Sequence, residues 1–177
     1  GQTSSGKTFT MEGVVDDEQL RGVIPRMVST IFSGIESAAT TVEFALRVSM
    51  IEVYQERIRD LLAADSGNGT DAVSPDTSAQ NNGSIAGATE VDPNNLRVFE
   101  DAARGIYVAG AKEVMIGAPS EVLDVLRRGQ RSRAAGATGM NANSSRSHSV
   151  FMLFLEQRDL VALSTKVGKL YLVDLAG

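Results

Sequence analysis

The first eight residues combine glycines, a lysine and a hydroxyl side chain in a spacing that suits phosphate binding. Glycines allow successive backbone N–H groups to turn toward phosphate oxygens, and a helix that starts directly afterwards adds its positive end. The lysine can reach the outer phosphates of a nucleotide, and the neighbouring hydroxyl can bind Mg²⁺. The alternative is a glycine-rich turn with an exposed lysine. The residues that fit the P-loop pattern G-x-x-x-x-G-K-S/T are Gly1, Gln2, Thr3, Ser4, Ser5, Gly6, Lys7 and Thr8.

A second candidate for phosphate and metal chemistry stands at the other end of the chain. Asp174 follows an apolar run that predicts a strand buried on both faces. A carboxylate there can hold Mg²⁺, usually through water, and Gly177 can offer its N–H to a γ-phosphate. An aspartate and a glycine after a strand are ordinarily a turn, but nucleotide hydrolases need this element together with a P-loop.

A third candidate site is the polar segment 141–149, which holds hydroxyls, amides and one guanidinium. Its backbone and hydroxyl donors could surround a γ-phosphate, and Ser145 could offer an oxygen to Mg²⁺. Arg146 could hold a carboxylate or stabilise phosphoryl charge. The alternative is an ordinary polar loop in which His148 starts a strand and makes a local hydrogen bond.

Length and composition restrict the remaining possibilities. The 177 residues and 18.8 kDa suit one domain. The net charge of −5 argues against a surface that binds nucleic acid or anionic membrane. The absence of cysteine excludes disulfides, thiolate metal sites and cysteine nucleophiles. The longest apolar run, 150–155, is far shorter than the roughly 20 residues of a membrane span, so we expect a soluble intracellular domain.

Hydrophobic periodicity predicts the elements that carry these motifs. Residues 22–37 predict a helix and 42–54 a strand, followed by a short helical turn over 56–62. Short strands are expected within 97–116, broken near 104–105 and at 110. Strands over 150–157 and 168–175 close the chain, and the alternation of strands and helices predicts an α/β sheet.

A helix is predicted from Pro119 onward, with Ser120 as its cap and a polar loop after it, over 134–149. Its last turns are expected to hold four arginines that suit the negative end of the helix dipole. They are Arg127, Arg128, Arg131 and Arg133.

Residues 63–95 differ from the rest of the chain. They are rich in Ser, Gly, Asn, Thr and Ala, with five acidic residues and neither lysine nor arginine. Such a segment cannot bury enough apolar area to offset the entropy of ordering it. We therefore predict a disordered, acidic surface insertion.

Taken together and in this order, the motifs resemble the motor domain of kinesins. Residues 1–13 resemble the family's P-loop and following helix, 141–148 match its switch I pattern N-x-x-S-S-R-S-H in full, and 172–177 match its switch II pattern L-V-D-L-A-G. Residues 22–26 and 52–62 also fit, so the resemblance covers nearly all of the chain except 63–95. The Ser-Ser pair before Gly6 is most similar to conventional kinesin heavy chains.

The resemblance implies an α/β fold of the P-loop NTPase type, with a mixed sheet flanked by helices, and ATP and Mg²⁺ as cofactors. It makes 1–177 a partial motor domain truncated at both ends, which we expect to be unstable and nearly inactive alone. Arg146 is expected to pair with a switch II glutamate beyond Gly177. The implied catalytic residues are Ser144, Ser145, Arg146 and Gly177; Phe9 and Asn141 join the P-loop in binding nucleotide, and the metal site is Thr8, Ser145 and Asp174.

For the whole protein, the resemblance implies ATP hydrolysis that drives movement along microtubules, through loops that reorder as the nucleotide changes. It implies a cytoplasmic location on the microtubule cytoskeleton, tubulin as partner, and neither nucleic acid nor membrane. A homodimer is expected through a coiled coil outside this chain. One alternative is a nucleotide-regulated or nucleotide-dead microtubule tether without motility; a Glu two residues after Gly177 would support hydrolysis, and its absence would support the tether. A GTPase is the other, but the chain has no N/T-K-x-D motif.

The chain departs from the family pattern in three places. Phe9 stands where conventional kinesins usually have His, which affects base stacking, and Ser132 stands where Asn is frequent. The acidic insertion falls near a segment that contacts tubulin in kinesins, for which Arg104 is the best candidate here. Because tubulin is strongly acidic, the insertion is expected to weaken the attraction if it faces tubulin.

Overall fold

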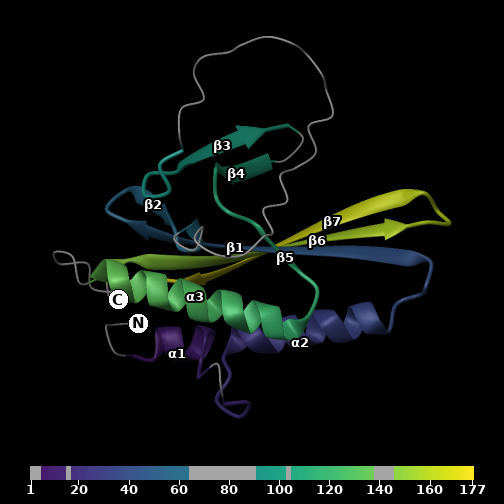
Figure 1. The fold of residues 1–177 in the computed structure, drawn as a ribbon, viewed down its shortest axis with the longest axis horizontal. Helices are drawn as coiled ribbons and strands as arrows, with labels where there is room; N and C mark the ends of the chain where they lie inside the picture. Colours follow the sequence, from purple (N-terminus) through teal and green to yellow (C-terminus); the bar gives the residue numbers. More distant parts are fainter. Residues whose placement is uncertain (1–4, 15–16, 64–90, 103–104, 138–145) are drawn as a thin grey trace, which may run out of the picture.

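The computed structural model describes residues 5–14, 17–63, 91–102, 105–137 and 146–177. Three long strands form the body of the main sheet: β1 (Val42–Tyr54), β6 (His148–Asp159) and β7 (Ser164–Asp174). The strand order is β2-β1-β6-β7, with β2 (Arg57–Asp60) and β5 (Val114–Ile116) both pairing with β1 (Figure 1). Among the described residues every strand pair is antiparallel. The predicted strand over 42–54 is confirmed at both ends.

The chain reverses directly after β1 in a tight turn. Gln55 and Glu56 have positive φ angles of 48° and 61°, the geometry of a two-residue hairpin turn that matches the twist of its strands. Ile58 then pairs with Val53. The prediction of a helical turn over 56–62 is wrong, because the tight turn places Arg57–Asp60 in register beside β1 as a strand.

The helices lie together on one side of the long strands (Figure 1). They are α1 (Lys7–Met11), α2 (Val23–Glu36), which confirms the helix predicted over 22–37, and α3 (Pro119–Ala137). No helix in the described residues is long and apolar enough to cross a bilayer. The core between helices and sheet includes Ile24, Val28, Leu46, Val48, Met50, Val122, Val125, Leu126, Phe151 and Leu153.

Both ends of α3 differ from expectation. Ser120 lies inside the first turn rather than at the cap, and Glu121 Oε2 instead accepts a hydrogen bond from Gly117 N at 2.7 Å. The helix continues to Ala137, into the predicted polar loop, and its last turn holds no basic residue. The dipole interpretation of the four arginines is therefore wrong, since they lie in the body of the helix.

The closing hairpin is longer than predicted and less buried. Strand β7 has only β6 as a partner among the described residues. Leu170 and Leu172 pack against the core, whereas Tyr171 and Val173 on the other face are 47% and 42% exposed. The expectation of a strand buried on both faces is wrong, because an antiparallel sheet packs one face on the core and can leave the other solvated.

A small second sheet consists of β3 (Arg97–Asp101) and β4 (Gly105–Ala109), which lie across the long strands from the helices (Figure 1). These strands and β5 confirm short strands within 97–116. Most of the predicted insertion, together with Arg104, lies outside the described residues. Its last residues, 91–95, are described, and Pro93 O accepts a hydrogen bond from Asp60 N at 2.7 Å.

The segment between α1 and α2 is closed at its base by two glycines. Gly22 N donates to Glu12 O at 3.1 Å, and Gly13 adopts a φ of 69°. A Cβ on Gly13 would collide with backbone atoms of Leu20 and Gly22. This closure fixes how α2 follows α1. Position 13 requires a positive φ and leaves no room for a Cβ, and only glycine meets both requirements.

We expect Gly13→Ala to destabilise the protein by about 1–3 kcal/mol, because it adds backbone strain as well as the collision. Gly34→Ala is the matched control: Gly34 lies in α2, and a Cβ added there would have no neighbouring atom within 4 Å. It should stabilise the helix by about 0.5–1 kcal/mol. Urea unfolding of both variants measures the difference, and equal effects would contradict the closure.

Candidate functional site

The P-loop pattern runs directly into α1. Gly6 caps the helix with a left-handed φ of 83°, and Thr10 N donates to Gly6 O at 2.8 Å. Ser5 and Gly6 are exposed, and Lys7 begins the helix. This turn into a helix is the local geometry that a phosphate-binding loop needs. Residues Gly1, Gln2, Thr3 and Ser4 lie outside the described residues.

Two predicted metal-binding residues from opposite ends of the chain meet. Helix α1 lies against the carboxyl end of β7 (Figure 1). There Thr8 Oγ1 donates a hydrogen bond of 2.5 Å to Asp174 Oδ2, and Asp174 is only 4% exposed. This contact between residues 166 positions apart joins the P-loop helix to the end of β7 that carries the switch II motif.

The free oxygen of Asp174 suits a hydrated Mg²⁺. Among the described residues Asp174 Oδ1 is buried without a hydrogen-bond partner, which is costly unless a further group satisfies it. Mg²⁺ typically uses one or two protein oxygens and fills its other positions with water and phosphate. No cluster of three or more His, Cys, Asp or Glu side chains that could hold a metal occurs in the part of the chain that the structure describes. One carboxylate oxygen beside the Thr8 hydroxyl fits Mg²⁺ held together with a nucleotide.

Arg133 is a buried residue beside the candidate site that the sequence analysis assigned incorrectly. Its side chain is 8% exposed, and Nη1 lies 3.3 Å from Asp174 Oδ2. Nη2 donates to Ser147 O at 2.9 Å. The sequence contains a signal for the burial of Arg133, because helical spacing places it on the same face of α3 as Val122, Leu126 and Gly129. An arginine on an apolar face indicates a buried partner.

Glu52, in the carboxyl-terminal half of β1, holds the opposite side of this cluster. Its Oε1 accepts a hydrogen bond from Ser147 Oγ at 2.7 Å and lies 3.6 Å from Arg133 Nε. Its Oε2 accepts bonds from Arg59 Nη2 at 2.7 Å and Arg59 Nε at 3.1 Å. The buried cluster thus contains two arginines and two carboxylates, with Asp174 as the second, and its charges balance.

Glu12 is a third buried carboxylate near this cluster. Burial raises its pKa above the ordinary 4.5, and the nearby charge of Asp174 raises it further. A hydrogen bond of 2.6 Å from Gln130 Nε2 and the charge of Arg133 oppose that shift. Glu12 thus attaches the end of α1 to α3 through a side chain that favours protonation.

Of the switch I motif, Asn141, Ser144 and Ser145 lie outside the described residues. Arg146 and Gly177 are exposed, as is Phe9 at 53%. His148 starts β6 as expected, but its Nδ1 accepts a hydrogen bond of 2.9 Å from Ala176 N, which is not local. That bond joins the start of β6 to the segment after β7.

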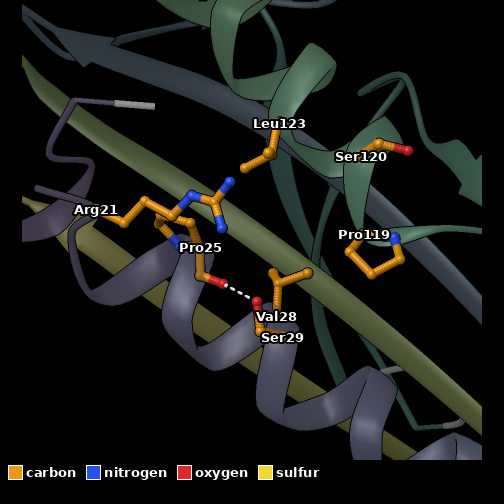
Figure 2. A pocket seen from close by; sticks show the side chains of 7 residues that line it. All are labelled: Arg21, Pro25, Val28, Ser29, Pro119, Ser120 and Leu123. Carbon is orange, nitrogen blue, oxygen red and sulfur yellow. Dashed lines mark hydrogen bonds between the residues drawn. The ribbon is translucent and has the colours of Figure 1, made fainter. Parts of the chain in front are cut away.

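A separate cavity of about 190 Å³ opens between α2 and the start of α3. Figure 2 shows the Arg21 side chain directed between Pro25 on α2 and Leu123 on α3. The lining includes none of the residues predicted to bind nucleotide or metal. This cavity is therefore separate from the candidate site at Thr8 and Asp174.

Comparison with known proteins decides the family. The sequence model of the kinesin motor domain matches residues 1–177. The chain belongs to the kinesin motor-domain family. It is 43% identical to kinesin-related protein 3 of Dictyostelium discoideum and 42% identical to the kinesin heavy chain of Caenorhabditis elegans. Both alignments cover the entire chain but only 13% and 18% of those relatives.

A solved kinesin has the same fold. The structure described as a fast kinesin, with implications for ATPase mechanism and interactions with microtubules, aligns with a TM-score of 0.82 at 43% identity. The alignment covers all of this chain and 43% of that one. This match confirms the predicted kinesin resemblance and the P-loop NTPase-type α/β fold class.

Removing the Arg133 side chain should be strongly destabilising. Arg133→Ala leaves Glu52 and Asp174 buried with less compensation, which typically costs about 3–5 kcal/mol. Arg131→Ala is the matched control, since Arg131 is exposed on the same helix, and should change stability by less than about 0.5 kcal/mol. Equal losses in urea unfolding would contradict the role of the buried cluster.

Glu12 should make stability depend on pH. A carboxyl group with a raised pKa in the folded protein stabilises that state below its ordinary value of 4.5. This contribution is lost as pH rises through the raised value. Burial also raises the pKa of Asp60, so part of the loss of stability with rising pH persists without Glu12. As the pH rises from 4.5 to about 8, we expect the free energy of unfolding to fall less in Glu12→Gln than in the unaltered protein. An identical fall in the two proteins would contradict the role of Glu12.

Proposed function

We propose that residues 1–177 are the nucleotide-binding part of a kinesin motor that binds ATP with Mg²⁺ and hydrolyses it. The observation that carries this proposal is the contact between Thr8 and Asp174. It joins the P-loop helix to the switch II motif, the two halves that a nucleotide hydrolase requires.

Each residue has a proposed task at this site. Lys7 binds the outer phosphates, and Thr8 and Asp174 bind the Mg²⁺ that accompanies the nucleotide. Bound Mg²⁺ supplies electrostatic stabilisation of the phosphates and a fixed geometry. Ser144 and Ser145 close over the γ-phosphate, Arg146 positions the attacking water through a glutamate, and Gly177 donates its N–H to the γ-phosphate. Phe9 and Asn141 contact the nucleotide.

Microtubules are the proposed track. Support comes from family membership and from the solved relative, whose description names interactions with microtubules. Kinesins are cytoskeleton-associated motors, so the location that we propose is the microtubule cytoskeleton. Assembly as a homodimer through a coiled coil outside residues 1–177 remains a prediction.

The site favours an enzyme over a passive tether. A nucleotide-dead tether has no need for a lysine and a hydroxyl in a P-loop pattern, or for a buried carboxylate oxygen without a partner, and this chain has these groups at Lys7, Thr8 and Asp174. Retaining such a carboxylate costs stability unless a ligand compensates it.

The test is microtubule-stimulated ATP turnover by the full-length protein. Lys7→Ala should reduce turnover at least about 100-fold, because a charge-assisted contact to the transferring phosphate is lost. Lys166→Ala is the control: Lys166 is an exposed lysine on β7 and should leave turnover unchanged. Retained microtubule binding without turnover in the unaltered protein would instead establish the tether.

A further inference from the structure

The segment after β7 lies beyond the strand pairing of the main sheet. The ladder between β6 and β7 ends at the pair of Ser149 and Asp174. Leu175 is 58% exposed, and Ala176 and Gly177 have little or no side chain to pack. Strand pairing therefore does not extend to the backbone that carries the Gly177 N–H, and apolar packing among the described residues contributes little to holding it.

The imidazole of His148 reaches this segment from the start of β6. Its Nδ1 accepts a partly buried hydrogen bond of 2.9 Å from Ala176 N. A backbone N–H can only donate, so Nδ1 is unprotonated and the neutral ring carries its proton on Nε2. The backbone of His148 lies opposite Val53 in the pairing of β6 with β1. A residue fixed in the sheet thus holds the residue that precedes Gly177.

We infer that His148 is a positioning residue that holds Ala176 and thereby directs the Gly177 N–H toward the γ-phosphate. Because Ala176 and Gly177 are adjacent, losing the bond at Ala176 allows the peptide group between them to rotate. The inference rests on the proposed function, in which Gly177 donates that N–H. It gives a role to the histidine of the switch I motif, which has no task in the proposed function.

This role concerns one phosphate and not the nucleotide as a whole. In the proposed site, Lys7 and Thr8 bind phosphate and metal from the P-loop, without help from His148. ADP has no γ-phosphate, so it should bind equally well with or without the bond at Ala176. A purely structural role of His148 would instead weaken the binding of ADP and ATP alike, because a displaced β6 disturbs the entire site.

The bond also makes the position of Ala176 depend on the charge of the imidazole. Protonation converts Nδ1 into a donor, so the imidazolium cannot accept the Ala176 N–H. Histidine side chains commonly change charge between about pH 5 and about pH 8, so γ-phosphate binding should weaken as the pH falls through this range. The charged and titratable groups that adjoining elements bring toward this end of β6 are Glu52 and Tyr54 on β1, Arg59 on β2, Arg133 on α3, Asp174 on β7 and Arg146 before β6.

The experiment measures the binding of two fluorescent nucleotides to the full-length protein with MgCl₂ present: mant-ADP and the non-hydrolysable ATP analogue mant-AMPPNP. His148→Ala should weaken mant-AMPPNP binding about two- to tenfold, the effect of one lost hydrogen bond, and leave mant-ADP binding unchanged. Arg158→Ala is the control, since Arg158 is exposed near the opposite end of the same strand, and should leave both dissociation constants unchanged.

His148→Asn separates the hydrogen bond from the proton, because the Asn side-chain oxygen can accept a hydrogen bond and does not titrate. At about pH 8, where the imidazole is neutral, this variant should bind mant-AMPPNP as the unaltered protein does. Between about pH 8 and about pH 5.5, the affinity for mant-AMPPNP relative to mant-ADP should fall more in the unaltered protein than in His148→Asn. Phosphate groups titrate in the same range, so the difference between the two proteins decides.

Equal losses for the two nucleotides in His148→Ala, or no loss for either, would overturn the inference while leaving the proposed function intact. An identical pH dependence in His148→Asn and the unaltered protein would overturn it as well. If His148→Ala does not fold, the comparison of His148→Asn with the unaltered protein decides alone. Failure of the unaltered protein to bind either nucleotide would overturn both the proposed function and the inference.

Discussion

The buried guanidinium of Arg133 is the constraint on which the rest of this structure depends. A buried cation must be compensated, and the compensating groups come from β1, the residue before β6 and the end of β7. Helix α3 therefore cannot slide or rotate on the sheet without leaving charges unpaired in the interior. The apolar core beneath α3 supplies cohesion, whereas the ion pairs specify which residues face one another.

That constraint also bears on how the candidate site forms between two motifs at opposite ends of the chain. Thr8 belongs to the first helix and Asp174 to the last strand, and neither could find the other through local structure. Arg133 fixes Asp174 from one side, and α1 brings Thr8 to the other. The P-loop helix of this kinesin is thus attached to the switch II strand through a shared carboxylate. The glycine closure between α1 and α2 holds the helix in the required direction.

Sequence patterns predicted the elements whose signals are local. Strand β1 and helix α2 follow their hydrophobic periodicity, and the three nucleotide motifs identified the family. The hairpin turn at Gln55 and Glu56 was missed because neither residue is typical of left-handed backbone. The extent of α3 was missed because its polar carboxyl half lacks apolar periodicity.

The site itself was predicted only in part. Thr8 and Asp174 were both identified from their motifs, but their direct contact depends on tertiary structure. Glu52 and Arg133 were missed because a buried charge is visible in sequence only through its place on an apolar face. Arginines near one another on a helix suggest an interaction with its dipole, and that interpretation hid the place of Arg133 on the apolar face of α3.

Because the hairpin of β6 and β7 is long, the candidate site depends on a turn at its opposite end. Pairing continues from Asp159 and Ser164 beside the turn to Ser149 and Asp174 at the opposite end, a length of about 35 Å. Side chains alternate between the two faces of a strand, so a slip of one residue in the pairing would turn Asp174 away from Thr8. A single-residue insertion or deletion at 160–163 that shifts this register would therefore separate Asp174 from Thr8 at the far end of the hairpin. In this fold, the length of a surface turn helps to determine which side chains meet at the candidate site.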